Sequence, residues 1–153
     1  MRLIEKILVA LDGSKPADRA LDFALDLAGK YSAEIVLLSV FEPVIPSLLY
    51  SPADLPIAPS MAVGSYSKEL KAQHRRVLAH ARRKAKKARP DLKISTKILE
   101  GRPSEKIVET AEQGKFDIII MGSQGLGRIK KIFLGSVSDR VADEASCPVL
   151  IIK

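Results

Sequence analysis

Short apolar runs alternate along this chain with longer segments of helical periodicity. Five runs rich in Ile, Val and Leu predict strands at residues 6–11, 34–41, 93–99, 116–121 and 149–152. Between them, apolar residues recur every three or four positions, which predicts helices at about residues 14–29, 65–89, 103–114 and 137–145. Strands that alternate with helices form parallel sheets with right-handed crossovers. We therefore expect an α/β fold with one doubly wound, five-stranded parallel sheet and helices on both faces.

Several helix boundaries are marked by residue type. Ser14 carries the side chain of a helix N-cap, and Gly29 is expected to end the helix that Ser14 begins. Pro90 stops the long second helix. That helix has one apolar face, made of Leu70, Val77, Ala81, Ala85 and Ala88. The run at 93–99 alternates polar and apolar residues, so we expect it at an edge of the sheet.

Size and composition indicate a single domain over residues 1–153, because 153 residues with 46% hydrophobic content can bury one sizeable core. No stretch approaches the roughly 20 apolar residues of a membrane span. The chain enters its first strand almost at once, so we expect no signal peptide. Cys147 is the single cysteine, which excludes an intrachain disulfide and favours a cytoplasmic location.

The segment at about 41–64 follows neither periodicity and contains five of the nine prolines. A connection longer than about 12–15 residues is either functional or disordered. One interpretation is a disordered surface loop. The other is a lid over a ligand or a docking surface, because large apolar residues such as Leu48, Leu49 and Tyr50 are costly to leave in water.

Glycines gather where the strand at 116–121 ends. Gly122 and Gly125 are followed, nine residues later, by Gly135 and Ser136. Glycine lets backbone N–H groups approach an anion without a Cβ in the way, and a helix that opens at Gly135 adds unpaired N–H donors and a positive dipole end. The pattern indicates a phosphate-binding turn, to which Arg128, Lys130 and Lys131 would add positive charge. Strand-to-helix turns also use glycine for purely structural reasons.

The glycine spacing fits neither the dinucleotide fingerprint GxGxxG nor the P-loop GxxxxGK[ST]. With the strand, loop and helix around it, the spacing resembles the G-x2-G-x9-G-[ST] motif of nucleotide-binding universal stress proteins. The resemblance covers nearly the whole chain. The segment Ile7 to Ser14 is similar to the family's first strand and turn, Glu100 to Ile107 to the turn into its third helix, and Pro148 to Lys153 to its closing strand. It implies a Rossmann-like fold of the adenine nucleotide alpha hydrolase-like type.

The resemblance also implies a site for ATP, or for ADP or AMP, with Mg or Mn carried by the phosphates. It places two groups of residues around the base and ribose, and a third group around the terminal phosphates. These are Ala10, Leu11, Asp12 and the backbone of Val40 near the base, Gly122, Ser123 and Gly125 along the ribose and phosphates, and Gly135, Ser136 and Val137 at the terminal phosphates.

The residues themselves leave other roles open. In a doubly wound sheet, ligands lie at the carboxyl ends of the strands, so Asp12 and Gly122 are expected to flank one crevice. Asp12 can equally cap the turn at Gly13 and Ser14, and the sequence from Ser136 to Asp139 also matches a capping box. Ala10 stands where the family often has proline, and Gln124 where it often has His or Arg.

Three functions remain after this reasoning. The first is an ATP-binding regulatory switch that couples nucleotide occupancy to an unidentified protein partner. The second is a slow ATPase, although the sequence contains no convincing catalytic residue and no metal cage. The third is a basic, nucleic-acid-associated protein, suggested by the net charge of +7 and a helix that carries Arg75, Arg76, Arg82, Arg83, Lys84, Lys86, Lys87 and Arg89. No aromatic residues alternate with these charges, so we favour a solvated helix face.

A homodimer is the expected assembly. The closing segment Pro148 to Lys153 is short and apolar, and an exposed apolar edge strand is an association hazard. Antiparallel pairing of two copies about a two-fold axis would cover both edges at once. The resemblance implies the same, because many members of the family dimerise through this strand.

Overall fold

Five parallel strands form a single sheet in the order β3-β2-β1-β4-β5. They are β1 (Lys6–Ala10), β2 (Glu34–Phe41), β3 (Ile94–Glu100), β4 (Ile118–Gly122) and β5 (Val149–Ile152). This computed structural model describes residues 3–43, 59–125 and 134–153, and it describes the side chains of all of these except 59–63. The doubly wound parallel sheet expected from the alternating pattern is confirmed.

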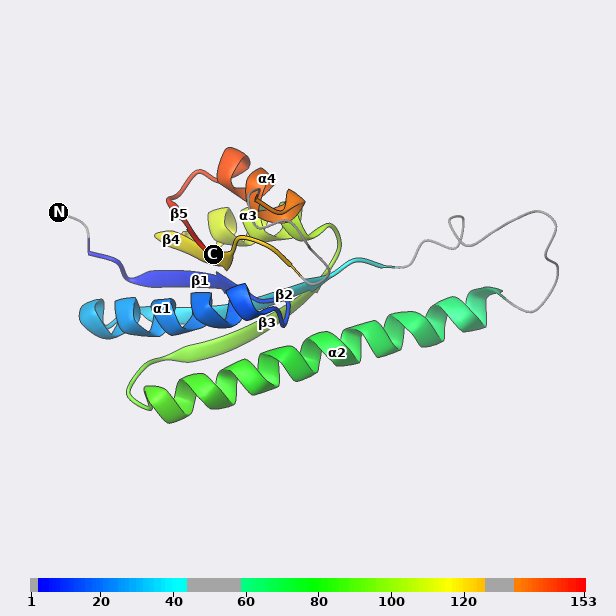
Figure 1. Ribbon diagram of the computed structural model, residues 1–153, viewed down its shortest axis with the longest axis horizontal. Helices are drawn as coiled ribbons and strands as arrows, with labels where there is room; N and C mark the ends of the chain where they lie inside the picture. Colours follow the sequence, from blue (N-terminus) through cyan, green and yellow to red (C-terminus); the bar gives the residue numbers. More distant parts are fainter. Residues whose placement is uncertain (1–2, 44–58, 126–133) are drawn as a thin grey trace.

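Two layers of helices cover the sheet. Helices α1 (Lys15–Tyr31) and α2 (Pro59–Ala88) lie on one face, and α3 (Pro103–Gln113) and α4 (Ser136–Glu144) lie on the other (Figure 1). The far end of α2 extends well beyond the sheet, as Figure 1 also shows. None of the helices in the described ranges is both long enough and apolar enough to span a bilayer.

The strand period of two divides the core between these layers. On β1, Ile7 and Val9 pack toward the α1 and α2 layer, whereas Leu8 packs toward α3 and α4. Ile120 and Ile119 divide in the same way on β4. All five side chains are fully buried, which explains why these strands read as continuous apolar runs. Truncating such a side chain to Ala costs about 2–5 kcal/mol of stability.

Helix α1 begins as predicted and ends later. Ser14 is its N-cap, and Oγ of Ser14 accepts a hydrogen bond from the N–H of Ala17 at 3.3 Å. The prediction that Gly29 ends the helix is wrong, because α1 continues to Tyr31. Gly29 lies under the guanidinium of Arg89, where any Cβ would overlap it. This glycine therefore makes room for the side chain of Arg89, which follows the end of α2.

Helix α2 begins earlier than predicted and packs through only part of its length. It begins at Pro59, a residue whose fixed φ suits a first helical turn, so the predicted loop at 41–64 includes six residues that are helical. Phe41, the first residue of the predicted loop, belongs to β2. Residues 44–58 of that loop lie outside the described ranges. Among the α2 side chains that the structure describes, from residue 64 onward, Leu78, Ala81 and Ala85 are buried. Ala88, which we also expected on this face, is exposed.

Two strands form the edges of the sheet, β3 at one side and β5 at the other. The alternating run at 93–99 is therefore an edge strand, as predicted. In β3, Ser95, Thr96 and Lys97 are exposed. In β5, all four residues are half-buried.

Candidate functional site

A cavity of about 390 Å³ opens where β1, β2 and β4 end. Strand order reverses at β1, so this is the crevice in which doubly wound sheets hold ligands. Nine of the ten residues predicted for the site line it, namely Ala10, Leu11, Asp12, Val40, Gly122, Gly125, Gly135, Ser136 and Val137. The topology thus brings together residues from three separate parts of the chain.

The tenth predicted residue, Ser123, lies behind the cavity wall. It is buried, and its carbonyl oxygen accepts two hydrogen bonds, from the N–H of Gly135 at 2.6 Å and from Oγ of Ser138 at 2.8 Å. These bonds join the end of β4 to the start of α4. Ser123 therefore positions the helix that faces the cavity.

The start of α4 presents backbone donors to the cavity. Gly135 is the N-cap, with an extended backbone and no side-chain cap hydrogen bond, so the predicted capping box at Ser136 is wrong. Ser138 instead turns inward, and its Oγ lies within hydrogen-bond distance of the carbonyl oxygens of both Ser123 and Gly135. The first N–H groups of a helix have no intrahelical partner. Ser136 and Val137, at this helix end, line the cavity, and helix ends of this kind suit an anion.

Two glycines at and just after the end of β4 allow other parts of the chain to approach the backbone closely. A Cβ on Gly122 would lie 2.8 Å from the backbone nitrogen of Ala17, so glycine there lets β4 end against the start of α1. A Cβ on Gly125 would lie 2.8 Å from Oδ2 of Asp12. Gly122 thus has a packing role, whereas Gly125 keeps the cavity open beside a carboxylate.

Asp12 does cap the turn that follows β1. Its Oδ1 accepts a hydrogen bond from the N–H of Ser14 at 2.9 Å, across a Gly13 with φ of 87°. Oγ of Ser14 in turn donates to the carbonyl oxygen of Gln124 at 3.4 Å. The turn after β1 is therefore tied to the segment after β4. The second oxygen of Asp12, Oδ2, faces Gly125.

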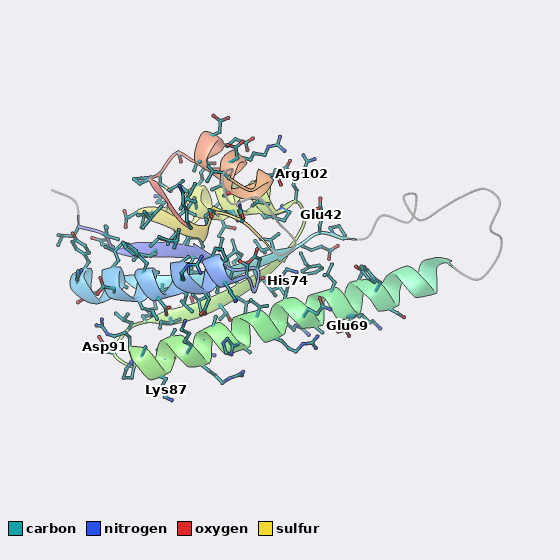
Figure 2. All side chains as sticks on the ribbon, in the orientation of Figure 1. Glu42, Glu69, His74, Lys87, Asp91 and Arg102 are labelled. Atoms are coloured by element: carbon teal, nitrogen blue, oxygen red, sulfur yellow. The ribbon has the colours of Figure 1, made fainter. Side chains whose placement is uncertain are left out.

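His74, a residue that the sequence reasoning did not consider, also lines the cavity. It comes from α2 and lies beside β2 (Figure 2). Its Nδ1 is 2.7 Å from Oγ of Ser39, and its ring centroid is 5.9 Å from that of Phe41. Burial lowers the pKa of His74, while the charge of Asp12 acts in the opposite direction. The sequence did contain one signal for a polar contact at this place: Ser39 is a polar residue near the end of a strand that is nearly all apolar.

Part of the cavity lining is apolar. Leu38 and Met121 contribute from the sheet, Ala17 from α1, and Pro103 and Ile107 from α3. Of these, the sequence reasoning assigned none to the site. Apolar residues at strand ends and first helical turns look like ordinary core residues until the topology places them around one space.

Arg128, Lys130 and Lys131, which we expected beside the phosphates, fall at 126–133 and lie outside the described ranges. In the ranges that are described, no three His, Cys, Asp or Glu side chains group closely enough to hold a metal ion.

The basic side chains of α2 are partly engaged with acidic neighbours. Lys84 lies 2.9 Å from Asp18 and 2.8 Å from Asp22 of α1, and Arg76 lies 2.9 Å from Glu69. Lys84 therefore helps to join α2 to α1. Arg76 and Lys84 are the basic residues of the described part of α2 that lie within ion-pair distance of an acidic side chain.

The fold and the cavity together define an α/β protein with an apolar crevice that ends in backbone donors. The chain belongs to the universal stress protein family, whose model matches residues 4–153. Over 151 residues it is 31% identical to the universal stress protein YxiE of Bacillus subtilis, covering 99% of this chain and 100% of that one. The family resemblance seen in the glycine spacing is confirmed.

Solved structures share the fold of this chain. The universal stress protein UspA from Lactobacillus plantarum matches the fold with a TM-score of 0.80 and 23% identity over 100% of both chains. A universal stress protein crystallised in complex with cAMP matches with a TM-score of 0.67 and 26% identity, covering 99% of this chain and 98% of that one.

Proposed function

We propose that this chain binds ATP, or another adenine nucleotide, and acts as a regulatory switch whose occupancy controls the binding of a protein partner. One observation carries the proposal: a cavity of about 390 Å³ has apolar walls at the end of β2 and backbone donors at the start of α4. Cavities of roughly 300–1,000 Å³ with a few directed polar groups are typical of small-molecule sites.

The two ends of the cavity suit the two ends of a nucleotide. Leu38 and Val40 offer an apolar surface to a flat base, and Asp12 adds a carboxylate acceptor beside it. At the other end, the unpaired N–H groups of Ser136 and Val137 suit a phosphate. A divalent ion such as Mg or Mn would arrive with the phosphates, because Mg is commonly held by substrate phosphates and water rather than by a protein cage.

The relative crystallised with cAMP supports an adenine nucleotide as the ligand class. That protein shares the fold with this chain over nearly the whole length of both. ADP and AMP fit the same reasoning as ATP, since the base end of the cavity is common to all three.

Binding, rather than catalysis, is the activity that the lining residues favour. Among the lining residues that the structure describes, the two with acid or base side chains are Asp12 and His74. His74 lies beside β2, which β1 separates from β4, and the carboxylate of Asp12 already accepts a hydrogen bond from the N–H of Ser14. A general base for phosphoryl transfer must lie within hydrogen-bond reach of the attacking group. We therefore propose that ATP hydrolysis is slow at most.

A homodimer is part of the same proposal. β5 is an edge strand whose four residues, Val149–Ile152, are half-buried within the single chain. Antiparallel pairing of two such edges about a two-fold axis would satisfy the open backbone groups of both copies.

Native mass spectrometry of the purified protein, followed by calorimetry with ATP, ADP, AMP and GTP, tests the binding proposal. We expect an adenine nucleotide to co-purify or to bind with saturable affinity, and GTP to bind more weakly. A protein that carries no nucleotide and gives no heat with any adenine nucleotide contradicts the proposal.

A further inference from the structure

Helix α2 holds the whole excess of positive charge of this chain. It contains nine Lys and Arg residues and one acidic residue, Glu69, whereas the rest of the chain contains 16 basic and 17 acidic residues. The helix therefore carries a net charge of +8 and the rest of the chain one of −1. Charge that is concentrated on one element produces a strong local field, and a positive field attracts polyanions.

The charges gather on the side of α2 that faces away from the sheet. Leu78, Ala81 and Ala85 bury the opposite side in the core. At one end of the helix, Lys87 points away from the sheet (Figure 2). Six cationic side chains are exposed and form no ion pair or hydrogen bond in the part of the chain that the structure describes, namely Lys68, Lys71, Arg75, Arg82, Arg83 and Lys87. With a rise of about 1.5 Å per residue, they extend along about 28 Å of the helix.

The composition of this face indicates which class of partner it suits. Protein interfaces have a core enriched in aromatic and apolar side chains, whereas nucleic-acid interfaces are more polar and much more positively charged. Between Lys68 and Lys87, every exposed side chain of α2 is charged or polar except that of Ala79. The face therefore suits a nucleic acid better than a protein.

Two other anionic partners suit this face less well. A helix that binds a bilayer buries its apolar face among the lipid headgroups, but the apolar face of α2 packs in the core. Single-stranded nucleic acid stacks its bases on aromatic side chains, and α2 has no Phe, Tyr or Trp between Lys68 and Lys87. The same absence led us to expect a solvated helix face from the sequence. It excludes base stacking, but a duplex needs only cations beside its phosphates.

We propose that the exposed face of α2 from Lys68 to Lys87 binds the phosphate backbone of double-stranded nucleic acid. Contacts to phosphates position a protein on a duplex and carry no sequence information, so the binding is independent of base sequence. This inference does not rest on the proposed function, because none of the six exposed cations lines the cavity.

Fluorescence anisotropy with two DNA duplexes of unrelated sequence tests the inference on the full chain. Six phosphate contacts predict a slope of about −5 for the logarithm of the association constant against that of the salt concentration. We therefore expect the affinity for both duplexes to fall about 1,000-fold between roughly 50 and 200 mM salt. The two duplexes should bind equally well at each salt concentration.

A triple variant, Arg75→Gln with Arg82→Gln and Arg83→Gln, removes half of these contacts. Each lost contact reduces the salt slope by about 1, so we expect a slope of roughly −2 to −3 and a loss of affinity of more than about tenfold in low salt. All three side chains are exposed, so circular dichroism should show an intact fold. Calorimetry should show the same affinity for ATP as in the wild-type protein.

A matched control removes three positive charges elsewhere. Lys97→Gln, Lys115→Gln and Lys153→Gln change the net charge equally, and these exposed residues lie outside α2. This control should keep the duplex affinity and the salt slope of the wild-type protein. Equal losses in both triple variants would show that net charge, and not this face, attracts the duplex, and the inference would be overturned.

The remaining outcomes also decide the question. A wild-type protein that binds neither duplex in low salt contradicts the inference. A preference of more than about tenfold for one duplex shows that bases are read and overturns binding through phosphates alone. Binding to vesicles of phosphatidylserine and phosphatidylcholine, without binding to either duplex, would assign the face to a membrane surface instead. Failure of ATP binding leaves this inference standing, because the duplex assay contains no nucleotide.

Discussion

Gly125 approaches Asp12 so closely that a Cβ on the glycine would lie 2.8 Å from Oδ2 of the carboxylate. Asp12 follows β1 and Gly125 follows β4, so this contact joins the two strand ends that flank the cavity. Asp12 is itself held by the N–H of Ser14. A larger residue at position 125 would therefore have to displace a fixed carboxylate or occupy the cavity.

Gly125→Val should abolish ATP binding measured by calorimetry while leaving the fold intact, because the added carbons collide with Asp12 at an exposed loop position. Gly135→Val should do the same, since its Cβ would lie 3.2 Å from the carbonyl oxygen of Ser123. Gly64→Val is the matched control, because nothing lies within 4 Å of a Cβ there. Unchanged affinity in both site variants would show that the phosphate site is elsewhere.

Ser39→Ala should reduce the free energy of unfolding by about 1–3 kcal/mol, because it leaves the Leu11 carbonyl oxygen and Nδ1 of His74 without their shared partner. Urea denaturation followed by circular dichroism measures this loss. Ser95→Ala, at an exposed position of β3, is the control and should change stability by less than about 0.5 kcal/mol. Equal effects at the two positions would contradict the structural role given to Ser39.

The free energy of unfolding should depend on pH through His74. Its folded pKa lies below 6.5, so between these two values the unfolded chain binds more protons than the folded chain. This contribution is fully present above about pH 6.5 and is lost as the pH falls through the folded pKa. Denaturation curves from about pH 5 to 7.5 should show a shallower slope for His74→Asn than for wild type. The same slope in both proteins would contradict this assignment.

Leu150→Pro, or deletion of Val149 to Lys153, should shift the protein from dimer to monomer and lower its stability. Proline cannot donate a ladder hydrogen bond, and β5 is the edge through which we expect two copies to pair. Sedimentation velocity at micromolar concentration measures the assembly. Ser95→Ala at the opposite edge should leave the dimer intact, and a monomeric wild-type protein would rule out this interface.

ATP turnover by the purified protein should fall well below the typical enzyme range of about 1–1,000 per second. Asp12 and His74 are the acid or base side chains among the described lining residues; Asp12 already accepts a hydrogen bond from the N–H of Ser14, and His74 lies beside β2, which β1 separates from β4. Phosphate release under steady-state conditions measures the rate. A robust rate that disappears in Asp12→Ala or Ser136→Ala would establish an enzyme instead.

Much of the architecture follows from the sequence pattern because that pattern is local. Apolar runs such as Glu34–Phe41 predict strands buried on both faces, and β2 has the bounds that the run predicts. The glycine spacing around Gly122 and Gly135 indicated an anion site at a strand-to-helix turn, and it led to the correct family. These features depend on residues close together in the chain, so a single sequence contains them.

Other features depend on which segments meet, and only the tertiary structure decides that. Gly29 lies inside α1, where the side chain of Arg89 packs against it. Gly135 rather than Ser136 is the N-cap of α4, and its N–H donates to the carbonyl oxygen of Ser123. His74 joins the cavity through Ser39, 35 residues away. Hydrophobic periodicity predicts that a helix has a buried face. The order of strands in the sheet determines which residues that face packs against.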